Sequence, residues 1–501
     1  MASAAPPLEH QTADETAPDA VYGPKELAGI WLRHLTAFFI PTVTLLFLVT
    51  GPHPWYLAAL FMFPLMCAHQ IDCSARRERR VRRDALPAWP FDLLVYALAG
   101  LQFWIVAEMV LLFSVQGIFS IDMLMVFLIV GGCAGFSIIT AHELIHRTNR
   151  AEQWLGRLLL ATVLYEHFYT EHLRGHHSRV GTRDDPATAR FGESFSAFWW
   201  RTVPAQFRSA WKLEATRLGD ADMPLTDRRM LGNRVLHGLF LEWSAALAVL
   251  AFFGLAAFAA YLLQAFVAVR LLEAVNYFEH WGLQRRTRGV QPVDSWDTHS
   301  WFTYYSLIGL SRHADHHAWP ARPYQQLRVL DEAPLLPYGY IGMVDFVIGR
   351  NDEFQELASQ ELARRRLGPF ALEESADPAA PTAPIDAAEA RARLAEARAE
   401  SDRPTHRGLL RRSLGALPPV ARRILLAAGL LLAVTLGVQW ETGSEMPFAA
   451  RLLLNAWIAA VFALSIATLS RVQEHLGNES VAWALGLSLL LALGTLTDLL
   501  L

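Results

Sequence analysis

Nine of the eighteen histidines in the chain fall into four short motifs. In the first motif, residues 142–146 read His-Glu-Leu-Ile-His, so two imidazoles are four residues apart and share one face of a helix. Two ligands of one metal ion need this arrangement, but the same pattern occurs in zinc peptidases and at ordinary helix ends. Taken alone, the first motif leaves a metal site and a structural helix end both open.

Two further motifs contain adjacent histidines. Residues 172–177 read His-Leu-Arg-Gly-His-His, and residues 313–317 read His-Ala-Asp-His-His. Clustered imidazoles repel one another when protonated and lose hydrogen bonds when buried, so packing alone does not explain them. The fourth motif supplies one histidine, which lies at the end of an apolar segment. This histidine becomes a candidate metal ligand because the other three motifs supply eight more. The predicted metal ligands are therefore His142, His146, His172, His176, His177, His280, His313, His316 and His317.

Nine imidazoles exceed the coordination sphere of one ion, because zinc in proteins usually takes four ligands. The motifs therefore predict two metal ions. Neutral nitrogen ligands suit iron, copper or zinc, and a ligand set without thiolates argues against an iron–sulfur cluster. A redox metal is favoured because a site that opens on a membrane meets apolar substrates and few hydrolysable ones.

An acidic residue stands beside a histidine in every motif. Ligating histidines commonly donate their second N–H to a carboxylate, which fixes the tautomer and the ring direction. We therefore predict that four acids support the ligands in this way, with direct metal ligation by Glu279 as the alternative. The four acids are Glu143, Glu171, Glu279 and Asp315.

The composition places these motifs in a membrane protein. The 501 residues are 53% hydrophobic and 18% charged, and a net charge of -4 lacks the basic footprint that nucleic-acid binding requires. A spanning helix needs about 20 mostly apolar residues. One long apolar run is interrupted at Gly254, and we interpret it as two antiparallel spans. Six predicted spans result: 31–50, 54–71, 91–113, 118–141, 235–253 and 255–278.

The arginines of one short loop predict the orientation of these spans. Residues 76–83 read Arg-Arg-Glu-Arg-Arg-Val-Arg-Arg, and a short loop of this kind stays on the cytoplasmic side. With this loop inside, both ends of the six-helix core and all four histidine motifs lie on the same side. We therefore expect a multi-pass protein of the inner (cytoplasmic) membrane whose site faces the cytoplasm.

The predicted fold is an all-α integral-membrane protein in four parts. Residues 1–24 are polar, carry no signal-peptide pattern and predict a disordered cytoplasmic tail. Residues 25–371 form the six-helix transmembrane core with the histidine-rich site. Residues 372–405 lack large apolar side chains and predict a low-complexity linker with room for one solvated helix. Residues 406–501 hold three more apolar segments, which predict a C-terminal three-helix membrane module.

With these motifs the chain resembles the integral-membrane alkane 1-monooxygenases, which are relatives of the fatty-acid desaturases. The discriminating motif is residues 276–283, Asn-Tyr-Phe-Glu-His-Trp-Gly-Leu, and residues 185–194 agree as well. The resemblance covers residues 25–350. Residues 294–297, Asp-Ser-Trp-Asp, and Ser311 depart from the family pattern. We expect these departures to lie near the site without touching a ligand, so that they concern the substrate more than the chemistry.

The resemblance implies two iron ions ligated by the nine motif histidines. It also implies hydroxylation of the terminal carbon of alkanes, or of similar alkyl chains, to primary alcohols with O2. Electrons would come from rubredoxin and its NAD(P)H-dependent reductase in trans. Cys67, Cys73 and Cys133 form no C-x-x-C pair that could hold a fused iron–sulfur centre. The substrate would enter from the bilayer, where membrane lipids surround the protein. The sequence leaves open whether the chain forms a homo-oligomer.

Two other functions remain as alternatives. A membrane fatty-acid desaturase or hydroxylase would use the same metals on an acyl chain, with Arg174, Arg179 or Arg183 available to a headgroup. A metal transporter or sensor would use the histidines as a transport site. Transporter sites lie near the bilayer midplane on interrupted helices, whereas these histidines gather at the ends of spans.

Overall fold

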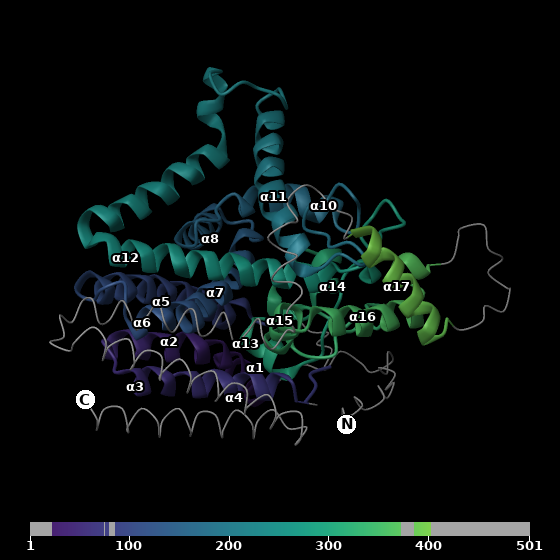
Figure 1. Cartoon of the computed structure of the whole chain (residues 1–501), viewed down its shortest axis with the longest axis horizontal. Helices are drawn as coiled ribbons and strands as arrows, with labels where there is room; N and C mark the ends of the chain where they lie inside the picture. Colours follow the sequence, from purple (N-terminus) through teal and green to yellow (C-terminus); the bar gives the residue numbers. More distant parts are fainter. Residues whose placement is uncertain (1–22, 75, 80–85, 372–384, 402–501) are drawn as a thin grey trace, which may run out of the picture.

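A computed structural model of the chain describes residues 23–74, 76–79, 86–371 and 385–401 (Figure 1). Within these residues the named elements are all helices, and strand pairing is limited to two isolated bridges. The four predicted histidine motifs all lie inside the described part. The predicted tail up to residue 22, most of the linker and the whole module 406–501, with its three predicted helices, lie outside it.

Four helices of the described part are long and apolar enough to cross a membrane. They confirm the prediction of a helical membrane protein. The predicted span 54–71 forms two shorter helices, α3 (Trp55–Leu60) and α4 (Met62–Asp72), and the total of six spans stays a prediction. The four long helices are Lys25–Thr50, which joins α1 (Pro24–His34), η1 (Leu35–Phe38) and α2 (Phe39–Thr50); α5 (Ala88–Val115); Ile121–Ile145, which joins α6 (Ile121–Met125), η2 (Val126–Val130) and α7 (Gly131–Ile145); and α12 (Arg234–His280).

The predicted break at Gly254 divides α12 into two arms. Gly254 has φ 86° and ψ -178°, a backbone conformation that is essentially restricted to glycine. Figure 1 shows the first arm descending to the far left and the second arm returning across α5 and α7. The second arm ends at His280.

Small residues bring the second arm of α12 close to α7. A Cβ atom at Gly131 would lie 2.5 Å from the Cβ atom of Val267, and one at Gly135 would lie 3.0 Å from a methyl group of Leu271. Glycines at helix interfaces let two backbones approach in this way. Because both helices run toward the same end of the bundle, this contact places the first motif and His280 side by side.

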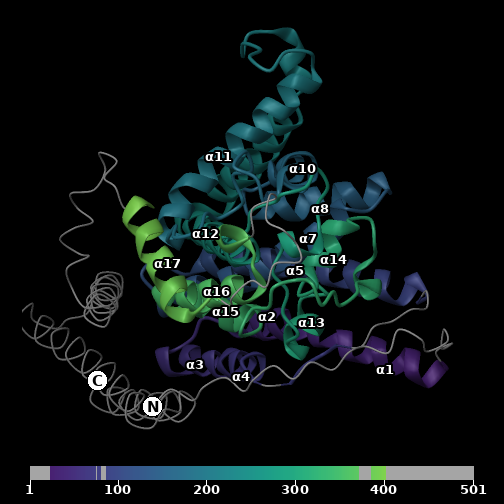
Figure 2. The ribbon, with the colours of Figure 1, turned by 90° about the vertical axis from the view of Figure 1, so that its right-hand side faces the viewer.

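Most of the remaining helices lie at that end of the bundle (Figure 2). They form two groups, one between α7 and α12 and one after α12. The first group is α8 (Arg150–Thr162), α9 (Phe168–Thr170), η3 (Glu171–His176), α10 (His177–Arg179), α11 (Phe195–Arg217) and η4 (Arg228–Gly232). The second group is η5 (Pro292–Asp294), α13 (Trp301–Ser306), α14 (His313–Ala318), η6 (Tyr324–Gln326), α15 (Tyr340–Gly349), α16 (Asn351–Arg365), η7 (Gly368–Phe370) and α17 (Ala387–Ser401).

Helix α17 corrects one sequence expectation. A helix does form within the predicted linker 372–405, but one face of it is packed and not solvated. Leu394 is 1% exposed, the Ser359 hydroxyl of α16 donates to the Ala390 carbonyl, and Arg398 donates to Gln355 at 2.6 Å. The alanine-rich composition did not predict this contact, because small side chains are compatible both with a solvated helix and with a closely packed one. Contacts between α17 and α16 therefore reach from Ala390 to Arg398.

The backbone of Gly254 gives a testable prediction. Gly254→Ala should destabilise the protein by about 1–3 kcal/mol, because an alanine side chain strains this conformation. The measurement is the thermal unfolding of the purified full-length protein in detergent. Gly100→Ala is the matched control, because Gly100 is also exposed but lies inside the regular helix α5 with no atom near its missing Cβ. The control should be neutral or slightly stabilising, and equal melting temperatures for both variants would contradict the two-arm reading.

Candidate metal centre

The nine predicted ligands lie in two adjoining groups. Within each group, the candidate nitrogen atoms all lie within 4.8 Å of one another. The rings of His177 and His317, which belong to different groups, have centroids only 4.5 Å apart. The five-histidine group is His142, His146, His172, His177 and His316; the four-histidine group is His176, His280, His313 and His317.

Each pair of adjacent histidines is divided between the two groups. His176 and His177 separate in this way, and so do His316 and His317. Successive side chains of a helix point about 100° apart, so two neighbours can face two different centres. The second and last motifs therefore each contribute to both groups and hold them next to each other.

A π-helical turn brings His172 and His177 together. Their Nε2 atoms are 3.0 Å apart, although residues five positions apart in an α-helix point about 140° away from each other. In η3 the His177 N–H donates to the His172 carbonyl, which is the i to i+5 pattern of a π turn. The extra residue in this turn realigns the two rings, and turns of this kind are frequent at functional sites.

The nitrogen distances fit ligands of a metal ion. The Nε2 atoms of His146, His172 and His177 form a triangle with sides of 3.0, 3.0 and 3.2 Å. Two nitrogen ligands that bind one ion at about 2.1 Å and at right angles are about 3.0 Å apart. Hydrogen bonds cannot satisfy all three sides, because each neutral imidazole has one N–H pointing in one direction.

The four-histidine group has the same geometry. The Nε2 atom of His313 lies 3.2 Å from that of His280 and 2.9 Å from that of His317. Across both groups, three further Nε2 atoms are buried and have no hydrogen-bond partner, those of His142, His176 and His316. Buried polar atoms are normally paired, so these nitrogen atoms fit metal ligation better than packing.

Burial keeps the imidazoles in the form that binds metal. It lowers the pKa of His146 and His172 well below the ordinary value, and the neighbouring histidines lower it further. The pKa values of His313, His316 and His317 are lowered by the same two causes. Neutral imidazole is the metal-binding species, so the site is prepared for an ion near neutral pH.

Glu279 differs from the other three predicted acids. Its Oε2 atom lies 3.3 Å from Nε2 of His313, on the side of the ring where the four-histidine group converges. Its Oε1 atom accepts a hydrogen bond of 2.6 Å from the Tyr340 hydroxyl. This position fits the alternative stated above, in which Glu279 is itself a ligand, because a supporting acid would instead contact Nδ1.

The remaining three acids have arginine partners. Glu143 accepts from Arg147 at 3.1 Å, and Glu171 accepts from Arg179 at 2.7 Å. Asp315 pairs with two arginines, Arg322 and Arg328. These contacts connect the motif helices to neighbouring arginine side chains. That the three acids also accept a hydrogen bond from a ligating imidazole stays a prediction.

Asp185 is a supporting acid that sequence reasoning missed. Its Oδ2 atom lies 2.9 Å from Nδ1 of His176 and accepts a second hydrogen bond of 2.6 Å from Thr188. Burial alone would raise the pKa of Asp185, but His176 and Thr188 bring it below the ordinary value. The carboxylate therefore holds the proton on Nδ1 and leaves Nε2 free for a metal. The only sequence signal was its place in the stretch 185–194.

Residues 294–297 touch the site more closely than the sequence predicted. Nδ1 of His280 lies 3.4 Å from the main-chain oxygen of Asp294, and the Asp297 carboxylate accepts from the Ala314 N–H at 2.8 Å. The expectation that these residues avoid every ligand is therefore wrong for Asp294. Because that contact uses the backbone, the change of side chain from the family pattern leaves it intact.

The chain is similar in sequence to several known proteins. Residues 121–346, which include all nine histidines, match the family model described as fatty acid desaturase. The chain is 37% identical over 230 residues to an alkane 1-monooxygenase of Acinetobacter baylyi, with 45% of this chain and 56% of the relative covered. It is 41% identical over 213 residues to alkane 1-monooxygenase 1 of Pseudomonas aeruginosa, with 41% and 55% covered.

A third relative is alkane 1-monooxygenase 1 of Alcanivorax borkumensis, which is 38% identical over 242 residues, with 46% of this chain and 58% of the relative covered. In all three comparisons the chain spans little more than half of the length of the curated relative.

The Asp185 contact leads to a second prediction. Asp185→Asn should weaken metal binding by the four-histidine group about 10- to 100-fold, because the amide no longer fixes the His176 tautomer. The measurement is metal retention during titration with a chelator. Asp184→Asn serves as the control, because Asp184 is the neighbouring acid and is exposed. Equal metal retention in the two variants would contradict a supporting role for Asp185.

Proposed function

We propose that the chain is a di-iron monooxygenase of the membrane fatty-acid desaturase and hydroxylase superfamily. The proposed reaction is hydroxylation of the terminal carbon of alkanes, or of similar alkyl chains, to a primary alcohol with O2. The curated relatives are named alkane 1-monooxygenases. The residues that match the desaturase family model include all four histidine motifs.

The observation that carries the proposal is the division of nine neutral imidazoles into two adjoining groups. Two groups suit two ions, whereas a hydrolytic zinc site needs only three protein ligands. We assign the five-histidine group to one iron and the four-histidine group, with Glu279 as a further ligand, to the other. Nitrogen ligands with one carboxylate are a set that iron accepts well.

The residues of the chain have distinct tasks in this proposal. Two bound iron ions would supply the reduction of O2 by two external electrons and the oxidation of a C–H bond. The nine imidazoles hold the ions, while Asp185 and the Asp294 carbonyl fix the ring directions of His176 and His280. The surrounding helices bury the site and exclude water, which prevents side reactions.

We propose that the metal centre faces the cytoplasm. The arginine loop at residues 76–83 carries the orientation signal, and its described residues bind the segment that bears the last motif. The Glu78 N–H donates to the His299 carbonyl at 2.8 Å, and Arg79 pairs with Asp331 at 2.8 Å. The loop and the histidines thus share one side of the protein, which supports an inner-membrane protein with a cytoplasmic site.

The electrons in this proposal come from rubredoxin and its NAD(P)H-dependent reductase in trans. The chain has only three cysteines, Cys67, Cys73 and Cys133, and none of them forms a disulfide. Four cysteine ligands are usual for an iron–sulfur centre, so this chain cannot hold one by itself. A separate carrier that docks near the buried site is therefore required.

The metal content gives a third prediction. The purified chain should hold close to two irons, and His280→Ala should lose iron and reduce hydroxylation about a hundredfold or more, because a ligand is removed. His237→Ala is the matched control, because His237 lies on the first arm of the same helix and is exposed. Elemental analysis that finds one metal ion, or mainly zinc, would contradict the di-iron proposal.

The reaction gives a fourth prediction. Incubation with octane under labelled O2, with rubredoxin and its reductase supplied, should yield octan-1-ol that contains the label. Omitting rubredoxin should abolish product formation, because the chain has no electron carrier of its own. An unlabelled alkene would instead indicate a desaturase. Turnover of acyl substrates alone would move the chain to the fatty-acid hydroxylase alternative.

A further inference from the structure

Two loops leave the candidate metal centre and are joined to each other directly outside it. Residues 178–184 and residues 281–289 each begin directly after a predicted metal ligand. The Arg285 N–H donates to the Gly181 carbonyl at 2.8 Å, and the Arg285 guanidinium donates to the Ser178 carbonyl at 3.0 Å. Two segments that carry ligands therefore hold each other in place where they emerge from the centre.

A glycine allows this contact between the loops. Gly181 has φ 75°, and a Cβ atom at this position would lie 2.9 Å from the Cβ atom of Arg285 and 3.0 Å from its backbone nitrogen. A side chain at Gly181 would therefore strain the backbone and push the two loops apart. The position of Arg285 is thus set by the backbone of the neighbouring loop.

The joined loops carry an excess of positive charge. Apart from Arg179, which pairs with Glu171, they contain four arginines and one acid, Asp184. Arg183 and Arg288 are exposed, and neither forms an ion pair in the part of the chain that the structure describes. The basic surface, as we call it, consists of Arg183, Arg285, Arg286 and Arg288.

This basic surface adjoins a ligand that is not fully buried. His177 is partly exposed, and it stands directly before Ser178, whose carbonyl accepts from Arg285. One hydrogen bond and a short stretch of backbone therefore connect the basic surface to an imidazole of the five-histidine group. Electron transfer through protein slows steeply with distance, so a carrier works best where its acceptor lies near the surface.

A second partly exposed ligand, His146, has different electrostatic surroundings. The next residue, Arg147, pairs with three acids, Asp92, Glu143 and Glu152. Acids therefore outnumber the arginine on that side. An acidic partner would be repelled there and attracted to the basic surface, because charge complementarity selects the orientation of an encounter.

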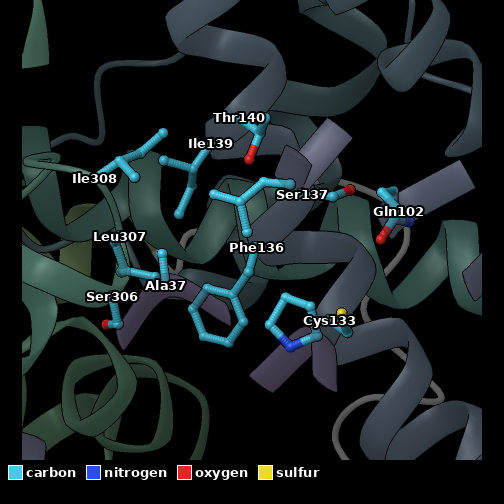
Figure 3. A pocket seen from close by; sticks show the side chains of 12 residues that line it. Ala37, Gln102, Cys133, Phe136, Ser137, Ile139, Thr140, Ser306, Leu307 and Ile308 are labelled. Atoms are coloured by element: carbon cyan, nitrogen blue, oxygen red, sulfur yellow. The ribbon is translucent and has the colours of Figure 1, made fainter. Parts of the chain in front are cut away.

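The membrane helices pack closely beneath the centre. A small cavity beside α7 is lined by residues up to Thr140, which precedes the ligand His142 by two positions (Figure 3). It holds about 20 Å³, which is room for about one water molecule, and none of its lining residues is charged. A soluble carrier must therefore approach from the opposite side, where the two loops emerge.

We propose that the basic surface docks the separate electron carrier, an acidic protein, and that electrons enter the centre at the five-histidine group. The inference rests on the proposed oxygenation, to which it adds the docking site. One turnover converts R–H, O2, two protons and two electrons into R–OH and water. A carrier of one electron therefore docks twice and is oxidised each time, and complementary charge speeds both encounters. Because the loops lie beyond the end of α12, a soluble protein fits this surface better than a lipid head group.

The test measures binding of zinc-substituted rubredoxin to the full-length, iron-loaded protein in detergent. Zinc makes the carrier redox-inert, so binding is measured without turnover. Arg183→Glu combined with Arg288→Glu should weaken binding about tenfold at low salt, because two attractive charges become repulsive, and the difference should shrink at high salt. Reoxidation of reduced iron rubredoxin by the oxidised protein, without O2 or alkane, should slow by a similar factor below carrier saturation.

Two further variants complete the test. Arg183→Gln combined with Arg288→Gln removes the charges without reversing them, and should weaken binding about threefold if the reversed variant loses iron. Arg228→Glu is the matched control, because Arg228 is also exposed but lies in the tip between α11 and α12 that projects away from the other helices (Figures 1 and 2). The control should bind rubredoxin as the unchanged protein does.

Several outcomes would overturn the inference. The unchanged protein could fail to bind rubredoxin, both double variants could bind it normally, or Arg228→Glu could weaken binding equally. Normal binding of rubredoxin by the double variants, together with loss of binding to phosphatidylserine micelles, would assign the surface to lipid. Rubredoxin that binds at the basic surface without any hydroxylated product would instead contradict the proposed oxygenation and leave the docking site intact.

Discussion

The close contact between α7 and the second arm of α12 decides where the candidate metal centre lies. Gly131 and Gly135 let the two helices approach until Val267 and Leu271 fill the space above them. Both helices end at the same level, so the first histidine motif and His280 meet there. A larger side chain at either glycine would push the helices apart and separate ligands that belong to adjoining groups.

The candidate metal centre imposes a second constraint, since it gathers nine mostly buried imidazoles that must stay neutral in order to bind metal. Burial favours the neutral state, but it also removes the water that would satisfy the ring nitrogen atoms. The protein supplies partners on the outer side of some rings, through Asp185 at His176 and the Asp294 carbonyl at His280. The inner nitrogen atoms then face one another, and metal ions are the partners that satisfy several of them at once.

The membrane helices also shape the approach to this centre. The cavity beside α7 lies within the apolar bundle, yet Gln102 and Ser137 give it a polar side. An enzyme that acts on a hydrocarbon chain must recognise it mainly by shape, because methylene groups offer no directional contact.

The sequence by itself determined the helical membrane class, the break at Gly254 and the nine histidines that come together, because apolar length, glycine and clustered imidazoles are local signals. Only the tertiary structure decided how the ligands divide into two groups. Adjacent histidines separate because neighbouring side chains on a helix point in different directions. The π turn at residues 171–176 pairs His172 with His177, whereas α-helical spacing would pair it with His176. Three further features depend on contacts between segments that no local sequence pattern reports. They are the hydrogen bond of Asp185 to His176, the position of the Glu279 carboxylate beside His313, and the packing of α17 on α16.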